Sequence, residues 1–513
     1  MLLVKTTIAP STIHGIGLFA DHIQEGAIMH TSFDVAPFIE RRQRFAEAIQ
    51  DGFAIIPGAQ EVVRNHDVHY EFRQNSDFFF LTGFDEPDAV ALINPARATE
   101  RFVLFVRPRD REREMWTGRR AGPEGAMAIY GADAAYPIDQ FGQKLREYAI
   151  DRTAVYYRLG NAAYDAQILQ LLTELRPVKT RGHTVPSRIE DPDPILHELR
   201  LRRSLAELVR HRRACEIARA AHTEAMRYAQ PGMHEYEVQA AIEFIFRRHG
   251  SPRNGYPSIV ASGPNACILH YTENTRRLED GDLVLIDAGC EYGYYSADIT
   301  RTFPVNGRFT AAQRLIYDIV LKAQLTAIDA AKPGNRYAAI HDAARRVLTE
   351  GLVALGLLPR SVDESLAMHH YREFYPHSTG HWLGMDVHDV GDYRVHRQSR
   401  VLEPGMVLTV EPGLYFDPER EMATYYLRAY SDVEMRERRD QLGMAAARKL
   451  ERAEKEQAQT LTHPIAQEFR GIGIRIEDDV LITEHGNEVL TQGTPKTLEE
   501  VEQMCAEVSR LPR

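Results

Sequence analysis

Residues 285–303 constrain the fold more than any other part of the chain. They read Leu-Ile-Asp-Ala-Gly-Cys-Glu-Tyr-Gly-Tyr-Tyr-Ser-Ala-Asp-Ile-Thr-Arg-Thr-Phe, so two apolar stretches flank a short turn at Tyr292-Gly293. With the turn centred there, Asp287 and Asp298 are expected to lie directly opposite each other. Like charges across a hairpin are destabilising unless a cation or a shared proton lies between them. The segment therefore predicts a β-hairpin with a polar site, which we favour over a surface hairpin with solvated aspartates because Asp287 continues an apolar run.

A second candidate segment holds three histidines within twelve residues, at His377, His381 and His388. Gly380 and Gly384 argue against a simple helix in this stretch. A single histidine is more often structural than a metal ligand, but three beside glycine turns indicate a site. One of them is therefore a candidate metal ligand.

Two glutamates come at the ends of apolar strands. Glu411 follows the strand expected at 407–410, and Glu477 follows the alternating strand expected at 472–476, where it shares one face with Arg475. Taken singly, each glutamate is explained as an ordinary salt-bridge partner. Together with the two aspartates and a histidine, they make an oxygen-rich donor set suited to two divalent ions such as Mn²⁺, Co²⁺ or Zn²⁺.

The chain is long enough for more than one domain. Its 513 residues predict two to four units, each able to bury its own core. Residues 37–181 are expected to form a smaller α/β domain with strands at 52–57, 89–94 and 102–106. A polar, Pro-rich passage at 182–194 is typical of a linker, so we expect a domain boundary there.

Residues 195–513 are expected to form a larger α+β domain. Helical periodicity covers 195–249, interrupted at Pro231-Gly232, and returns at 311–331 and 338–355. Short β-rich runs lie at 283–286, 407–410 and 472–476. Within this domain, an insertion at about 417–467 contains a highly charged, helix-forming stretch, which we interpret as a solvated helix or helical hairpin hinged at Gly443 rather than a partner-binding arm.

Composition excludes several classes of protein. The net charge of -11 argues against nucleic acid as a partner. No apolar run reaches the ~18 to 20 residues that a bilayer requires, and the N-terminus has no signal-peptide core, so we expect no membrane partner and a cytoplasmic location. The four cysteines show no Cys-x-x-Cys spacing, which fits a reducing compartment and argues against a zinc finger.

Several motifs together resemble one enzyme family, the metallopeptidases of the pita-bread fold, which include methionine aminopeptidase, prolidase and aminopeptidase P. The resemblance covers residues 37–416 and 468–490. Its motifs in the larger domain are Ile-Leu-His-Tyr-Thr-Glu-Asn at 268–274, Asp-Ile-Thr-Arg-Thr-Phe-Pro-Val-Asn-Gly at 298–307, His-Trp-Leu-Gly-Met-Asp-Val-His at 381–388 and Gly-Ile-Gly-Ile-Arg-Ile-Glu-Asp-Asp at 471–479. The resemblance implies an α+β pita-bread catalytic domain behind a smaller α/β domain, and two divalent metal ions, Mn²⁺ before Co²⁺ or Zn²⁺.

The resemblance also assigns the metal ligands. By motif they are Asp287, Asp298, His381, Glu411 and Glu477. In the family, the residues corresponding to Asp298 and Glu477 bridge the two ions, Asp287 binds one, and His381 and Glu411 complete the other. These five side chains are therefore the expected metal site.

Further roles follow from the same resemblance. Glu411 would take the proton from the attacking water and help to pass it to the leaving nitrogen. His388 and His270 would face the substrate and steady the tetrahedral intermediate. His377 and Arg475 would support the site from behind, with Arg475 orienting a bridging carboxylate.

The N-terminal domain narrows the expected substrate. Phe-Arg-Gln-Asn-Ser-Asp-Phe-Phe-Phe-Leu-Thr-Gly-Phe-Asp-Glu-Pro at 72–87 resembles the leading domain of aminopeptidase P, which methionine aminopeptidases lack. The resemblance implies release of the N-terminal residue from peptides with proline in second position. Trp116 and Asp67 would wall the mouth of the site across subunits, since members of the family are commonly dimers or tetramers.

Two alternatives stay open. Prolidases share both domains, so an Xaa-Pro dipeptidase is the main one. An inactive module that only binds peptide is the other, although such modules lose their ligands and all five are present here.

The first 36 residues stand apart from this resemblance. His-Gly-Ile-Gly-Leu-Phe-Ala at 14–20 resembles the opening of a SET methyltransferase domain. No later motif of that domain follows, so we interpret residues 1–36 as a truncated or fused extension without methyltransferase activity.

Overall fold

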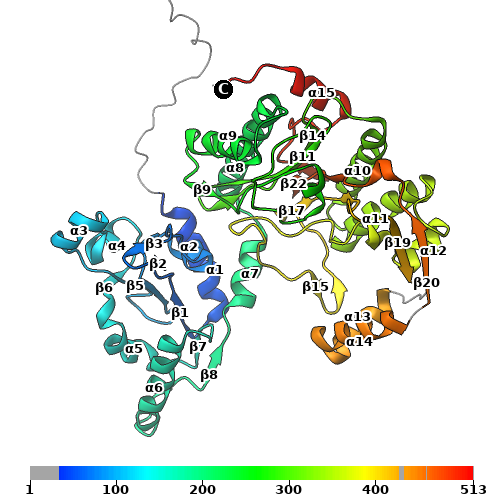
Figure 1. The fold of residues 1–513 in the computed structure, drawn as a ribbon. Coiled ribbons are helices and arrows are strands. Elements are labelled where there is room, and N and C mark those ends of the chain that lie inside the picture. Colours follow the sequence, from blue (N-terminus) through cyan, green and yellow to red (C-terminus); the bar gives the residue numbers. More distant parts are fainter. Residues whose placement is uncertain (1–33, 427–431, 458, 512–513) are drawn as a thin grey trace, which may run out of the picture.

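The computed structural model describes residues 34–426, 432–457 and 459–511 (Figure 1). The SET-like motif at 14–20 therefore lies outside the described residues. The ribbon shows an N-terminal α/β part and a larger part made of mixed helices and short strands. Among the described helices, none is long and apolar enough to cross a membrane.

The N-terminal part is built on a six-stranded mixed sheet of order β6-β5-β4-β1-β7-β8. Its strands are β1 (Phe53–Pro57), β4 (Val90–Ile93), β5 (Phe102–Val106), β6 (Ala134–Pro137), β7 (Ala154–Tyr156) and β8 (Arg188–Glu190). Its helices are α1 (Ala36–Ile49), α2 (Ser76–Thr82), α3 (Arg111–Thr117), α4 (Gly122–Ala128), α5 (Phe141–Ala149) and α6 (Ala162–Lys179), with the short turn η1 (Ile138–Gln140). A separate hairpin pairs β2 (Val63–Asn65) with β3 (Val68–His69). The three strands predicted here are confirmed.

Both faces of this sheet are buried. Ala54 and Ile56 of β1 belong to a core that includes residues of α1 and α2. Phe53 and Ile55 point to the opposite core, which includes residues of α5 and α6. Because successive side chains of a strand face opposite sides, a sheet covered by helices on both faces needs continuous apolar strands such as this one.

The passage expected to be a linker, residues 182–194, is not free of secondary structure. Within it, β8 pairs in parallel with β7 through Arg188–Glu190, so the sheet extends this far. The next helix already begins at Asp193. The exact division of the chain into domains stays a prediction.

The larger part combines long helices with several short sheets. Its helices are α7 (Asp193–Leu201), α8 (Leu205–Tyr228), α9 (Glu235–Arg248), α10 (Ala311–Ala330), α11 (Tyr337–Ala354), α12 (Val362–Ala367) and α15 (Leu498–Ala506), with the short turns η2 (Gly263–Cys267), η3 (His370–Glu373) and η4 (Gln467–Phe469). The helices expected at 195–249, 311–331 and 338–355 are confirmed, including the break before α9. A Ser204–Glu207 capping box starts α8.

The strands of this part pair mainly in antiparallel fashion, in the sheets β10-β11-β14, β13-β12-β9, β17-β22-β23 and β18-β21. They are β9 (Arg253–Asn254), β10 (Ile259–Ser262), β11 (Leu283–Asp287), β12 (Cys290–Tyr292), β13 (Tyr295–Ser296), β14 (Thr300–Pro304), β17 (Val407–Val410), β18 (Gly413–Tyr415), β21 (Gly473–Arg475), β22 (Asp478–Ile482) and β23 (Asn487–Val489). One large apolar core joins β10, β11, β12, β14, β18 and β21 to α8, α9, α10 and α11. A second core packs β17 and β22 against α10 and α11. Two further antiparallel pairs lie outside these sheets. They are β15 (Arg394–Val395) with β16 (Gln398–Ser399) and β19 (Met422–Tyr426) with β20 (Thr460–Pro464).

Side chains of the N-terminal part reach into the larger part. Arg73 forms an ion pair of 2.5 Å with Glu291, beside the β12–β13 turn. The ring of Tyr294 stacks on that of Phe79, with centroids 3.6 Å apart. The turn of the β12–β13 hairpin is therefore held against the N-terminal part.

The charged insertion folds as the helical hairpin that the sequence predicted. Helices α13 (Asp432–Leu442) and α14 (Met444–Gln457) are separated by Gly443, whose φ of +77° suits glycine. Arg438 and Glu454 join the two helices at 2.7 Å. The hairpin extends from the outer β19–β20 pair (Figure 1).

Candidate metal centre

The five predicted ligands come together in one place, which we call the acidic cluster. Each lies at or beside the end of a short strand or turn, because strand ends leave side chains free to converge. Asp287 ends β11, Glu411 follows β17, and Glu477 lies between β21 and β22. Asp298 and His381 lie in loops next to β14 and β17, and their ligand atoms and those of Glu477 fall within 4.8 Å of one another.

Tyr256 links the two aspartates. Its hydroxyl oxygen lies 2.6 Å from Oδ1 of Asp287 and 2.6 Å from Oδ1 of Asp298. A hydroxyl has a single proton to donate, so the second carboxylate contact requires a proton on that carboxyl or a cation nearby. The two aspartates thus share one polar site, as the sequence indicated.

The predicted pairing of these aspartates is nevertheless wrong in register. The turn lies at Gly293-Tyr294, one residue later than expected, so Asp287 pairs with Thr300 rather than with Asp298. Both turn residues have positive φ, +57° and +71°, as a type I′ hairpin turn requires. Stacking of the Tyr294 ring holds this unusual conformation, a contact that no local pattern reveals.

Two glycines allow the segments that carry the ligands to approach closely. A Cβ atom at Gly289 would lie 1.7 Å from the carbonyl oxygen of Ala297, next to Asp298. A Cβ atom at Gly380 would lie 2.0 Å from the carbonyl oxygen of Thr409. A larger residue at either glycine would therefore push the two neighbouring segments apart and displace the metal ligands that they carry.

The carboxylates of the cluster are difficult to ionise together. Burial, and then the charge of Asp298, raises the pKa of Glu477 well above its usual value. Burial and the charge of Asp287 raise the pKa of Asp298, and burial raises the pKa of Glu411 to about 7. Because a nearby cation would relieve this repulsion, the cluster favours bound positive charge.

His381 is oriented as a ligand to such a cation. Its Nδ1 lies 3.0 Å from the main-chain oxygen of Trp382 and donates to it, which leaves Nε2 facing the cluster. Nε2 lies 3.4 Å from Asp298 and 3.9 Å from Glu411. Burial lowers the pKa of His381, but the hydrogen bond with Asp298 outweighs it and raises this pKa to about 9. With hard oxygen donors and one imidazole, the residues fit divalent metal ions.

Arg475 supports the cluster from behind. It is 3% exposed, and its Nη2 lies 2.6 Å from Oδ2 of Asp287. Its Nε donates to the hydroxyl of Thr300, which donates in turn to Glu477 at 2.6 Å. Arg475 thus holds one carboxylate directly and a second through Thr300.

The other predicted histidines lie around the cluster. His377 accepts or donates at 2.9 Å with the hydroxyl of Tyr415, and its Nδ1 lies 3.6 Å from Glu411. Burial and the charge of Arg475 lower the pKa of His377 to about 3, so its ring is neutral. The exposed His388 has its ring centroid 4.2 Å from that of His381. The exposed His270 is close enough to His377 and His388 to influence both electrostatically.

Trp116 and Asp67 are not brought to the cluster within this chain. Trp116 lies on α3 and is 86% exposed, and Asp67 lies exposed between β2 and β3. Figure 1 places α3 at the far end of the N-terminal part from β11 and β14. Their predicted contribution would require a second chain and stays a prediction.

Three residues near the cluster were not predicted from the sequence: Tyr256, Thr300 and Tyr415. Tyr256 lies in an irregular loop that carries no motif of its own. Thr300 could have been noticed because it follows Asp298 by two residues on the same hairpin. Tyr415 joins His377 and Arg475 through its hydroxyl, a link that appears only in three dimensions.

Two family models match the chain. Residues 209–484 match the model of metallopeptidase family M24, and residues 38–156 match that of the aminopeptidase P N-terminal domain. These two ranges correspond to the larger part and to most of the N-terminal part.

Curated relatives are similar over nearly the whole chain. The Xaa-Pro aminopeptidase of Escherichia coli (strain K12) is 44% identical over 468 residues, covering 91% of this chain and 96% of the relative. Xaa-Pro aminopeptidase 3 of Homo sapiens is 32% identical, covering 87% of this chain and 79% of the relative.

Solved structures of aminopeptidases are also similar to this chain over most of its length. The structure of Pseudomonas aeruginosa aminopeptidase PepP superimposes with a TM-score of 0.82 at 43% identity, covering 92% of this chain and 98% of that one. Zinc-substituted E. coli aminopeptidase P in complex with product gives a TM-score of 0.80 at 42% identity, with 93% and 99% covered.

Proposed function

The chain belongs to metallopeptidase family M24, and on this premise we propose that it is an Xaa-Pro aminopeptidase, releasing the N-terminal residue from peptides with proline in second position. The predicted fold class, a pita-bread catalytic domain behind a smaller α/β domain, is confirmed by the family matches and solved structures. The observation that carries the proposal is the acidic cluster, with all five ligand positions filled beside Arg475 and His377.

The acidic cluster would hold the metal. We propose two divalent ions, with Mn²⁺ as the preferred metal and Co²⁺ or Zn²⁺ as possible substitutes. Ions bound there would lower the pKa of a water towards ~7 and polarise the scissile carbonyl. The remaining chemistry falls to side chains of the chain.

Glu411 is the proposed proton carrier. Its carboxylate lies beside His381 and His377 in the cluster, where it can take a proton from water and give it to a leaving nitrogen. The neutral ring of His377 lies 3.6 Å from this carboxylate and does not compete for the proton that Glu411 carries. His388 and His270 stand on the exposed side, where they can donate hydrogen bonds to the tetrahedral intermediate.

The substrate class follows from the chemistry of proline and the charge of the site. A peptide bond to proline lacks an N–H and carries a rigid ring on its nitrogen, so a dedicated site is needed to cleave it. We propose that the positively charged α-amino group of the substrate lies beside a carboxylate of the cluster, so that cleavage is confined to the N-terminus. Cytoplasmic location, absence of nucleic-acid and membrane partners, and a dimeric or tetrameric state stay predictions.

Product analysis tests the proposal. Protein loaded with Mn²⁺ is incubated with an X-Pro-Y tripeptide and, separately, with an X-Pro dipeptide, and the released amino acids are resolved. We expect cleavage mainly of the tripeptide, yielding X and Pro-Y. Cleavage of the dipeptide alone would establish a prolidase instead, and no cleavage of either with metal bound would indicate a peptide-binding module.

A further inference from the structure

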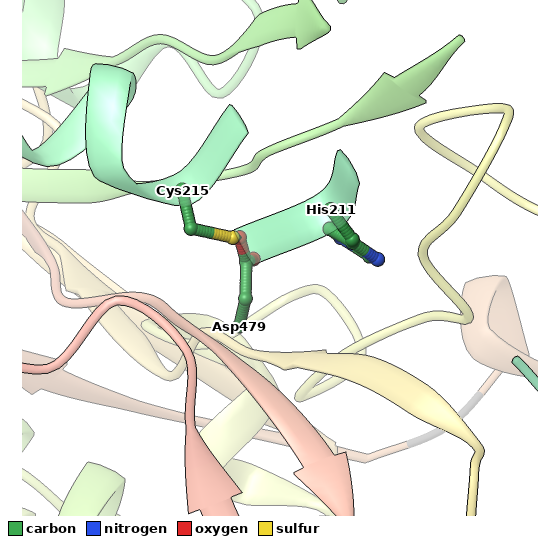
Figure 2. A group of neighbouring side chains, drawn as sticks. All are labelled: His211, Cys215 and Asp479. Atoms are coloured by element: carbon green, nitrogen blue, oxygen red, sulfur yellow. The ribbon is translucent and has the colours of Figure 1, made fainter. Parts of the chain in front are cut away.

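A second group of potential metal ligands lies apart from the acidic cluster. His211 and Cys215 are one helical turn apart on α8, and Asp479 lies opposite them on β22 (Figure 2). We call these three residues the buried triad, because each has an exposed fraction of 0%. One ligand atom from each lies within 4.8 Å of those of the other two.

The polar groups of the buried triad are only partly satisfied. The Cys215 thiol donates to Oδ2 of Asp479 at 3.2 Å. Within the described part of the chain, the two ring nitrogens of His211 have no partner with good hydrogen-bond geometry, although the main chain of Ser296 approaches the ring. Oδ1 of Asp479 has no such partner either. Buried polar groups without partners are rare and call for a water or an ion to explain them.

The chemistry of the triad favours an ion. Burial and the charge of Arg203 lower the pKa of His211 to about 3, so the imidazole is neutral, the form that binds metal. The charge of Arg203 is itself offset, because its guanidinium pairs with Asp389. Nitrogen, sulfur and oxygen donors in one site are typical of zinc rather than of the harder Mn²⁺ or Mg²⁺.

We propose that His211, Cys215 and Asp479 bind one zinc ion, separate from the acidic cluster. A thiolate and a carboxylate together neutralise the two charges of Zn²⁺, so no net charge is left buried. Binding forms the Zn–S bond and releases the thiol proton. Zinc–ligand lengths of ~2.0 to 2.3 Å in a tetrahedron place ligand atoms ~3.3 to ~3.8 Å apart. Ligand atoms of the triad that lie up to 4.8 Å apart would therefore approach by up to ~1.5 Å on binding, with water as fourth ligand.

Such an ion would stabilise the segments behind the acidic cluster. Oδ2 of Asp479 accepts a hydrogen bond of 3.1 Å from the main-chain N–H of Asp298. Asp479 on β22 also follows Glu477 by two residues in the chain. Zinc at the triad would therefore hold the chain near two ligands of the acidic cluster and act structurally, because its site is sealed from solvent.

Cobalt substitution tests the proposal without using activity. The full-length protein is produced in minimal medium supplemented with Co²⁺, so that the ion is present while the chain folds. A cobalt–thiolate bond gives a charge-transfer band in the near ultraviolet, whereas the acidic cluster has no sulfur ligand. We expect this band in the wild type and its loss in Cys215→Ala. The matched control is Cys290→Ser, a buried cysteine that donates to Ala214, and it should keep the band.

Metal counting gives a second readout. Wild-type protein grown with zinc should contain about one more ion per chain than His211→Leu. The absence of the cobalt band from the wild type, or its persistence in Cys215→Ala, would overturn the proposal. If a variant fails to fold, the wild-type spectrum by itself still tests the proposal, because the absence of the band there would overturn it. Because the band does not depend on peptide cleavage, failure of this proposal is distinct from failure of the proposed function.

Discussion

The acidic cluster and the buried triad are joined by one hydrogen bond, from the main-chain N–H of Asp298 to Asp479, yet their surroundings differ sharply. The cluster is flanked by His270 and His388, which are exposed, whereas all three residues of the triad are fully buried. The cluster offers mostly carboxylate oxygens, and the triad offers one nitrogen, one sulfur and one oxygen.

This difference in exposure indicates that the acidic cluster serves catalysis and that the buried triad stabilises the fold. A site that must admit a peptide and exchange protons with it needs an open side and a carboxylate placed to carry a proton, as at Glu411. A site that is sealed can only hold the chain together. The comparison teaches that changes at the cluster should affect turnover, and changes at the triad should affect stability.

The largest effect is expected from Glu411→Gln. The amide cannot carry the proton, so kcat should fall by ~10² to 10⁴ while much of the metal is retained. Steady-state kinetics on an X-Pro-Y tripeptide and metal analysis of the same sample measure both quantities. Glu403→Gln, at a half-exposed glutamate that pairs with Arg202, is the control and should leave both unchanged. Full turnover in Glu411→Gln would contradict the assignment of catalysis to the acidic cluster.

A smaller loss is expected from Arg475→Lys. Lysine cannot contact Asp287 and Thr300 together, so the carboxylates lose their fixed orientation and metal affinity should fall ~10- to 100-fold. Titration of activity against Mn²⁺ concentration measures this affinity. Arg470→Lys, at a partly exposed arginine paired with Glu421, should behave as wild type. An unchanged Mn²⁺ dependence in Arg475→Lys would show that the arginine does not support the cluster.

The buried triad should instead control stability in acid. The pKa of His211 is about 3 in the folded chain and ~6.5 when unfolded, so between these values the unfolded chain binds a proton that the folded chain does not. Stability from this residue is complete above ~6.5 and is lost as pH falls towards 3. His211→Leu should therefore lose less Tm than wild type between pH 7 and pH 5. The same change at the exposed His183 is the control, and equal losses in all three proteins would contradict the assignment.

The smallest effect is expected from removing the helical insertion. Replacing residues 427–459 with Asn-Gly would join β19 to β20 at the Tyr426–Thr460 pair through a two-residue turn. Because the hairpin is held largely by its own contacts, such as Arg438–Glu454, Tm should change by only a few degrees. Metal content of both regions should stay the same. A loss of metal from either region would show that the insertion supports that region.

Local patterns predicted a large share of this molecule. Short continuous apolar runs located strands such as β4 and β17, and helical periodicity located α10 and α11 almost to the residue. The charged insertion was also recognised as helical, because helix formers and charges fill it with a single glycine between two helices. These features depend on neighbours within a few residues, which is why sequence suffices for them.

Long-range contacts decided the rest. The turn of the hairpin was predicted one residue too early. Tyr294 has positive φ in the actual turn, and its ring stacks on Phe79, which is far away in the sequence. Tyr256 carries no motif, yet its hydroxyl joins two aspartates.

The sequence by itself determined which side chains could bind metal and which strands would carry them. Spacing along α8 even places His211 and Cys215 on one face, since residues four apart on a helix are neighbours. Only the tertiary structure decided that Asp479 lies beside that pair. It also decided that the acidic cluster is flanked by exposed histidines, whereas the buried triad is sealed from solvent. Burial is a property of everything packed around a residue, and so it appears only when distant segments of the chain come together.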